Sequence, residues 1–167
     1  MSDNWIILIP INPEYVPDAA MQEKARRLYG SFVPDADEVS IYLTEGVRFV
    51  SQGANFESVS CPKCGTRLDL DWWNAAMTEA CGTNWEDDAS YDDVLSAEEP
   101  IFTNLEVTTP CCGSTLSLND LDYNWPAGFA RFALEAMNPN VYNISNEQIG
   151  SLERLLNCKL RRIWLHI

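Results

Sequence analysis

The residues best suited to bind a metal are the cysteines of two similar stretches. Residues 61–70 read CPKCGTRLDL and residues 109–118 read TPCCGSTLSL. The stretches share a proline, a cysteine, a glycine and two leucines at equivalent positions. A C-x-x-C-G turn directs two thiolates at one point, and its glycine permits the backbone conformation that the turn needs. Two such knuckles predict a site of four thiolates around one Zn²⁺.

The second stretch is irregular, because Thr109 stands where the first has a cysteine and an additional cysteine follows at position 111. We predict four ligands of a structural zinc ion, Cys61, Cys64, Cys111 and Cys112. Cys81 is an alternative fourth ligand, and a site of three thiolates and a water, or an empty site, is a third alternative. A disulfide between the two adjacent cysteines is disfavoured, because its small ring needs a strained peptide bond.

Acidic residues dominate the charge. The net charge is −14, and residues 86–99 read EDDASYDDVLSAEE without one base. Such a surface repels phosphate backbones, so nucleic acid is not an expected partner. A basic protein partner is favoured, because opposite fields steer association. The predicted contact residues combine acids with aromatic anchors: Trp85, Glu86, Asp87, Asp88, Tyr91, Asp92 and Asp93. In the alternatives, the acids are only solvated and the aromatic residues pack around the zinc module.

Catalysis has little support in the sequence. The one histidine, His166, is next to last, and nothing near it suggests the third group of a catalytic triad. There is no P-loop and no G-x-G-x-x-G. An all-cysteine ligand set is typical of structural zinc, whose binding contributes folding energy. We therefore predict a non-enzymatic protein; the alternative is a zinc-dependent or carboxylate enzyme of unknown substrate.

The sequence also predicts a cytoplasmic location. No apolar run approaches the roughly 20 residues that a membrane helix needs. The N-terminal segment lacks the basic region and cleavage site of a signal peptide. In a reducing compartment the six cysteines favour metal binding or burial over disulfides.

The outer parts of the chain predict an α+β fold. Residues 5–11 are apolar enough for a strand covered on both faces. Residues 18–29 predict a helix that ends at Gly30, and residues 39–43 and 47–49 predict a hairpin around a turn at 45–46. In the C-terminal part, we expect strands at 128–136 and 160–167 on either side of a helix that starts at a capping box, Ser145 with Gln148, and ends at Asn157.

These elements indicate a ferredoxin-like antiparallel sheet with one additional strand and two helices on one face. Residues 1–57 and 126–167 would form this sandwich. Residues 58–125 would be a zinc-ribbon-like insert with a short helix after the first knuckle and a strand at 101–107. We expect one composite domain, because each outer part alone is too small for a good core; two small domains are the alternative.

The knuckles also carry a resemblance. Residues 108–139 and 152–167, with the earlier C-P-x-C-G, resemble a group of small uncharacterised bacterial cytosolic proteins with C-P-x-C-G, T-P-C-C-G and W-P-x-G-F-A-R-F motifs. The resemblance implies that Cys111 and Cys112 belong to a metal site, and it implies no activity. In size and composition the chain is also similar to immunity proteins that neutralise bacterial toxins. This likeness implies a cognate toxin as partner; the oligomeric state stays open.

Overall fold

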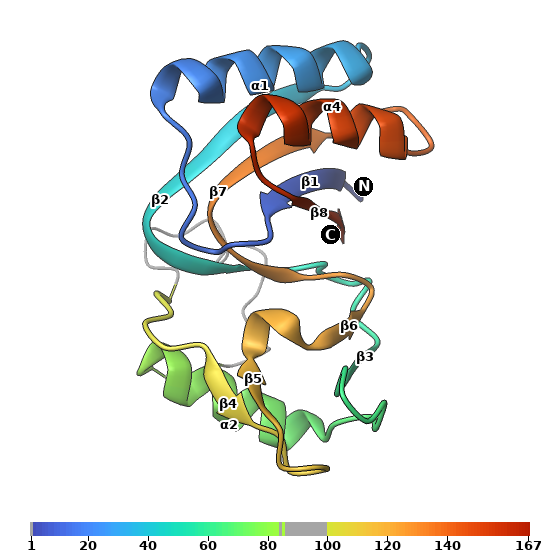
Figure 1. Cartoon of the computed structure of the whole chain (residues 1–167). Coiled ribbons are helices and arrows are strands. Elements are labelled where there is room, and N and C mark those ends of the chain that lie inside the picture. The colour runs from blue at the N-terminus through green and yellow to red at the C-terminus, as the bar shows by residue number, and fades with distance from the viewer. Residues whose placement is uncertain (1, 84, 86–99) are drawn as a thin grey trace.

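The computed structural model describes residues 2–83, 85 and 100–167. The chain is an α+β protein whose main sheet has four antiparallel strands in the order β2-β7-β1-β8. Two helices, α1 and α4, cover one face of this sheet (Figure 1). The bounds of these elements are β1 Asn4–Pro10, α1 Ala19–Phe32, β2 Glu38–Val50, β7 Gly128–Met137, α4 Asn146–Leu156 and β8 Leu160–His166.

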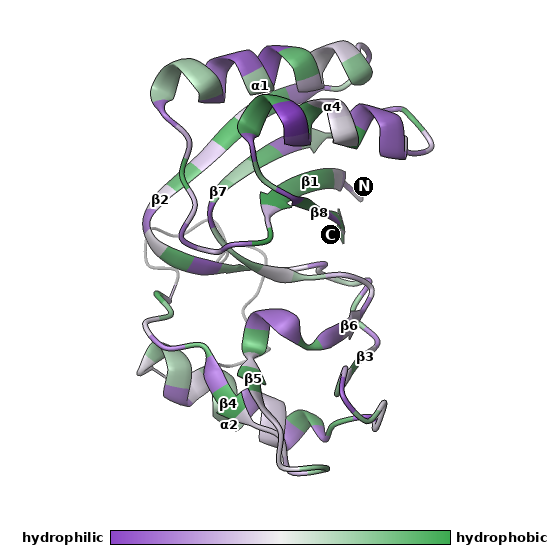
Figure 2. Cartoon of the chain, in the orientation of Figure 1, coloured by the Kyte–Doolittle hydropathy of each residue, from purple (hydrophilic) through white to green (hydrophobic). Residues whose placement is uncertain are grey.

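The predicted burial of the first strand on both faces is confirmed. Ile6 and Leu8 pack in the cluster beneath the helices, whereas Ile7 and Ile9 pack in a cluster on the opposite face. All four side chains are buried. The continuous hydrophobic colour of β1 in Figure 2 reflects this position between two cores.

The predicted hairpin at residues 39–49 is wrong. Glu38–Val50 is one strand, and both of its halves pair with β7. The register shifts between Leu43 and Arg48, so the expected turn is an irregularity of the kind that bends a strand. The bend brings Val50 and its β7 neighbours into the core that covers Ile7 and Ile9. Within the described residues, the main sheet therefore has no additional strand.

Local sequence signals determine most helix ends. The Asp18 side chain accepts from the Met21 N–H at the start of α1. The helix continues through Gly30 to Phe32, so the predicted end at Gly30 is wrong. The predicted capping box at Ser145 is present, and Asn157 ends α4 in the left-handed conformation with φ 52°.

A smaller module lies between β2 and β7 in the sequence and below the main sheet in Figure 1. It contains two pairs of short antiparallel strands, β3 with β6 and β4 with β5. The predicted strand at 101–107 is observed only at its end, as β4. The module's elements are β3 Ser58–Ser60, α2 Leu70–Cys81, β4 Glu106–Thr108, β5 Thr115–Ser117, the 3₁₀ helix η1 Leu118–Asp120 and β6 Asp122–Asn124.

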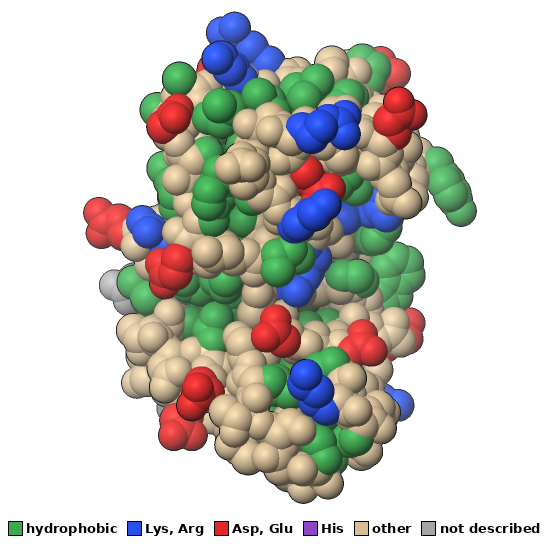
Figure 3. All heavy atoms as spheres, in the orientation of Figure 1, with side chains coloured by type: hydrophobic (Ala, Val, Ile, Leu, Met, Phe, Trp, Pro, Cys, Tyr) green, Lys and Arg blue, Asp and Glu red, His purple; other side chains and the backbone are tan. Residues whose placement is uncertain are grey.

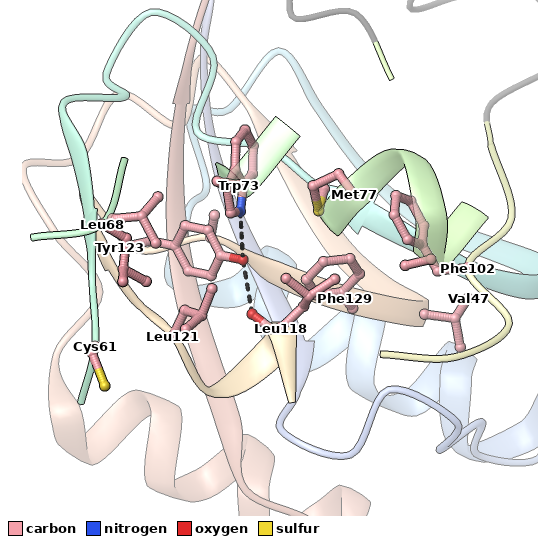
Figure 4. Close-up of a cluster of buried hydrophobic side chains, with 13 residues drawn as sticks. Val47, Cys61, Leu68, Trp73, Met77, Phe102, Leu118, Leu121, Tyr123 and Phe129 are labelled. Atoms are coloured by element: carbon pink, nitrogen blue, oxygen red, sulfur yellow. Dashed lines mark hydrogen bonds between the residues drawn. The ribbon is translucent and has the colours of Figure 1, made fainter. Parts of the chain in front are cut away.

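The core of the module is shared with the main sheet. Val47 of β2 and Phe129 of β7 belong to the same buried cluster as Trp73 and Tyr123 (Figure 4). The Trp73 indole N–H donates to the Tyr123 hydroxyl at 3.3 Å, and that hydroxyl donates to the Leu118 carbonyl at 2.8 Å. The module thus packs against the part of the sheet formed by the C-terminal half of β2 and the start of β7. Within the described residues, no helix is long and apolar enough to cross a bilayer.

Candidate metal centre

Both knuckles are tips of hairpins with the same hydrogen bonds. In the first knuckle, the Cys61 N–H donates to the Thr66 carbonyl at 2.9 Å, and the Cys61 carbonyl accepts from the Gly65 N–H at 2.8 Å. In the second, Thr109 makes the two equivalent bonds at 3.0 Å each. The sequence repeat is therefore also a structural repeat, with Thr109 in the place of Cys61.

Each knuckle turns at a glycine in a left-handed conformation. Gly65 has φ 76° and Gly113 has φ 70°. A side chain on either residue would be strained in this region, whereas glycine enters it freely. The glycines thus explain how two short hairpins direct their cysteines to the same point.

The structure brings four cysteine sulfurs together, all within 4.8 Å of one another. The Sγ atoms of Cys64 and Cys111 are 3.4 Å apart, and those of Cys61 and Cys112 are 3.8 Å apart. Ligands about 2.3 Å from a tetrahedral metal ion lie about 3.8 Å from one another. The four thiols therefore fit a tetrahedral ion of the size of Zn²⁺, with two ligands from each knuckle.

The surroundings of the thiols favour thiolates unequally. Hydrogen bonds from Ser114 and then Thr109 lower the pKa of Cys112 to about 6. The hydroxyl of Thr66 lowers the pKa of Cys64. Desolvation raises the pKa of Cys111 to about 11. Because metals bind the thiolate, a cation at this point would offset the desolvation of Cys111.

Thr109 lies beside the cysteine cluster, a role that its sequence pattern did not predict. Its Oγ1 lies 3.9 Å from Sγ of Cys61 and 3.6 Å from Sγ of Cys112. The side chain is 1% exposed, so its hydroxyl is held beside the two sulfurs. In the sequence, Thr109 aligns with Cys61, and this alignment indicates only that a cysteine is missing at position 109.

The other two cysteines lie outside this cluster. The Cys81 thiol, the alternative fourth ligand, is 3.7 Å from the Thr78 carbonyl and 3.3 Å from that of Thr83, at the end of α2. Cys158 packs against the core beneath the helices, and burial raises its pKa to about 11. The structure thus gathers the predicted set and gives Cys81 different contacts.

The predicted partner surface is described at one residue. Trp85 packs edge-on against the rings of Phe49, Trp73 and Phe102, at centroid distances of 5.4, 6.2 and 5.7 Å. The ring is partly buried against the module core, and its role as a partner anchor stays a prediction. The other predicted contact residues lie outside the described residues: Glu86, Asp87, Asp88, Tyr91, Asp92 and Asp93.

The histidine contacts an amide side chain of the neighbouring strand. His166 Nδ1 lies 2.7 Å from Oδ1 of Asn4, at the end of β8. Across the described ranges, no carboxylate or thiol is bonded to its ring. This contact holds the C-terminal strand against β1.

Comparison with known proteins adds no relative. No protein-family model, curated protein or solved structure matches the chain. The metal centre is therefore supported by its own geometry, namely four thiols, two equivalent turns and a hydroxyl beside two of the sulfurs.

Proposed function

We propose that the four cysteines hold one structural Zn²⁺ and that the insert is a zinc-ribbon-like module. The observation that carries the proposal is the grouping of four sulfurs within 4.8 Å. Four protein ligands complete a tetrahedron, whereas a catalytic zinc keeps one position for water or substrate. The ion would join the β3 knuckle to the β4–β5 hairpin, and its binding would contribute folding energy to the module.

We also infer a ferredoxin-like arrangement for the rest of the chain. The units β1-α1-β2 and β7-α4-β8 interlock, because β7 lies between the parallel strands of the first unit and β1 between those of the second. This order supports the split β-α-β pattern of that fold. The module would then be an insertion between the second and third strands.

For the whole chain we propose a cytoplasmic, non-enzymatic protein-binding role. The net charge of −14 supports a basic protein partner, because complementary fields accelerate encounter. Asp and Glu side chains occur over both the main sheet and the module on the face drawn in Figure 3. A toxin whose basic active-site cleft is blocked by this protein is the most concrete partner.

The zinc proposal is tested on the purified full-length protein. We expect one zinc per chain, and Co²⁺ substitution should give the spectrum of a tetrahedral four-thiolate site. Removing the ion should unfold the module. If the ion leaves while the fold persists, or binds an additional water, the site is catalytic in type and the structural proposal fails.

The partner proposal is tested by affinity capture from the native host, followed by binding kinetics with the purified partner. Neutralising Asp87, Asp88, Asp92 and Asp93 as Asn should slow association and reduce its salt dependence. The matched control neutralises four exposed acids elsewhere: Asp35, Glu38, Glu45 and Glu147. Unchanged association rates in the first variant would reject steering by this segment.

A further inference from the structure

The edge strand β8 has one side bonded to β1 and one side that faces away. Asp3 and Ile167 exchange backbone hydrogen bonds of 3.1 and 3.0 Å, and the Ile11 N–H donates to the Lys159 carbonyl at 2.9 Å. Bonding alternates along an antiparallel pair. The odd-numbered residues of β8 therefore bond to β1, and the backbone groups of residues 160, 162, 164 and 166 point outward.

The C-terminal end of this outer edge is covered. The His166 N–H donates to the Gln52 carbonyl at 3.3 Å, and the His166 carbonyl accepts from the Ala54 N–H at 2.9 Å. The Trp164 carbonyl accepts from the Asn55 side chain at 3.0 Å. The chain that follows β2 thus covers the edge from the Trp164 carbonyl onward.

The middle of the edge is open. At its start, the Leu160 N–H donates to Glu153 Oε2 at 3.0 Å. Four backbone groups then have no partner among the described residues: the Leu160 C=O, the Arg162 N–H and C=O, and the Trp164 N–H. A row of unpaired strand groups is a template for a further strand.

This open edge borders a cleft of about 570 Å³ between the main sheet and the module. Arg161, Arg162 and Trp164 line the β8 side. Asp120 and Asp122 line the module side, together with Pro62 and Pro126. The two walls therefore carry opposite charges.

The hydrogen bonds that hold both arginines come from groups other than carboxylates, and Asp120 acts on Arg161 through its charge. Nη1 of Arg161 donates to both oxygens of Asn119 and to the Ala127 carbonyl at 2.9–3.0 Å. Nη1 of Arg162 donates to the Ile144 carbonyl, and its guanidinium lies 4.5 Å from the Trp164 ring centroid. In the described part of the chain, neither arginine has an ion-pair partner within 4.0 Å. Preorganised guanidinium groups of this kind suit capture of a carboxylate.

We propose that an extended segment of a protein partner adds to β8 at Leu160–Trp164 as a short additional strand. The inference rests on the protein-binding role proposed above. The segment carries an acidic side chain opposite Arg162 and a basic side chain toward Asp120 and Asp122. Main-chain bonds supply affinity in such strand addition, and opposite-charge pairs across the strands select the sequence. The covered ends of the edge limit the added strand to about four or five residues.

The test uses the full-length, zinc-loaded protein. A display library of random seven-residue segments is selected for binding, and enriched segments are synthesised with a fluorophore. We expect selected segments to contain both an acid and a base. In the free protein, the amides of Arg162 and Trp164 should exchange with solvent faster than those of Arg161 and Ile163. Bound peptide should slow the first pair. If no segment is enriched, or if the first pair of amides is unaffected, the proposal is overturned.

Two substitutions isolate the main-chain contribution. Arg162→Ala and Arg162→Pro lose the same side chain, but only proline also removes the outward N–H. The bonds to β1 come from the neighbouring residues and are kept. We expect peptide affinity to fall at least about tenfold further in the proline variant. Equal affinities of the two variants would reject strand addition.

A series of N-methylated peptides tests the same point if the proline variant does not fold. N-methylation of single residues of the selected peptide should abolish binding at alternating positions, and uniform tolerance counts against the proposal. Zinc content and protection of the Ile163 amide verify the fold of each protein variant. A protein that binds no zinc, or a partner whose association rate does not depend on salt, would reject the proposed function. Neither result would change the peptide-binding and amide-exchange measurements at β8.

Discussion

Thr109 occupies in the second knuckle the position that Cys61 occupies in the first. Both residues donate their N–H to the carbonyl that closes the turn and accept from the following glycine. Their side chains nevertheless differ in role: Cys61 contributes a sulfur to the cluster, whereas Thr109 places a hydroxyl beside two sulfurs. The second knuckle therefore has the same turn as the first, but one of its two clustered cysteines stands at position 111 instead of position 109.

Substitutions can return the cysteine of the second knuckle from position 111 to position 109. Cys111→Lys alone should lower zinc affinity by more than the 10- to 100-fold typical of outer-shell changes, because a ligand is lost. The double variant Thr109→Cys/Cys111→Lys gives the second knuckle the C-P-K-C-G sequence of the first and should recover most of the affinity. Competition with a chromogenic chelator measures both. Cys81→Ser and Cys158→Ser are the controls and should bind zinc normally; a double variant that stays as weak as Cys111→Lys would refute the equivalence.

The hydroxyl of Thr109 should tune the site without holding the metal. Thr109→Val keeps the shape of the side chain and removes the contacts with the sulfurs of Cys61 and Cys112. We expect zinc affinity to fall about 10- to 100-fold with one zinc still bound per chain. Thr109→Ser, which retains the hydroxyl, is the matched control. Equal affinities for the valine and serine variants would assign Thr109 to packing alone.

Arg161 should join the module to the main sheet. Its Nη1 donates to Asn119 of η1 and to the Ala127 carbonyl. Arg161→Met would leave these oxygens without a charged donor, and we expect the free energy of unfolding to fall by about 2–4 kcal/mol. Urea denaturation of the zinc-loaded protein measures this change. Arg154→Met, on the exposed side of α4, should change it by less than about 0.5 kcal/mol.

Alkaline pH should destabilise the protein through a buried phenol. The Tyr29 hydroxyl donates to the Ile6 carbonyl at 2.7 Å, and burial raises the pKa of Tyr29 well above its ordinary value. Above about pH 10 the unfolded chain loses this proton and the folded chain keeps it, so the free energy of unfolding falls as pH rises. Tyr29→Phe should weaken this dependence. The same change at the fully exposed Tyr142 should leave it unaltered. Urea midpoints at pH 8 to 11 supply the comparison.

Two glycines should respond in opposite ways to alanine. Gly53 has φ 59°, and an added Cβ would lie 2.4 Å from the His166 carbonyl oxygen. Gly53→Ala should therefore destabilise the protein by about 1–3 kcal/mol and loosen the contact with β8. Gly30 lies inside α1 with open space around it, so Gly30→Ala should stabilise by about 0.5–1 kcal/mol. Thermal unfolding of the pair tests both signs.

The parts of the fold that follow from local patterns could be predicted from the sequence. The two-sided burial of β1, the capping box at Ser145 and the end of α4 at Asn157 each depend on a few neighbouring residues. The gathering of the four cysteines was equally predictable, because a knuckle is a local turn and two similar knuckles suggest a shared metal.

The errors concern contacts that are distant in the sequence. A hairpin and a bulged strand have the same alternating side chains, and only pairing of both halves of β2 with β7 distinguishes them. The contacts of Trp85 also depend on distant residues, because its ring neighbours Phe49 and Phe102 come from β2 and from beyond the acidic run. The role of Thr109 also needs Cys61, which lies in the other knuckle.

The location of the module affects how quickly the protein can fold. Val50 and Gly128 are paired at the end of the β2–β7 ribbon, although the whole module separates them in the sequence. Closing a loop of that length while it is unstructured has an entropic cost that slows non-local strand pairing. A module folded around the proposed metal ion would bring Val50 and Gly128 close together before β2 and β7 pair. The proposed ion would then affect the rate of refolding as well as the equilibrium, although its site lies at the tips of the hairpins.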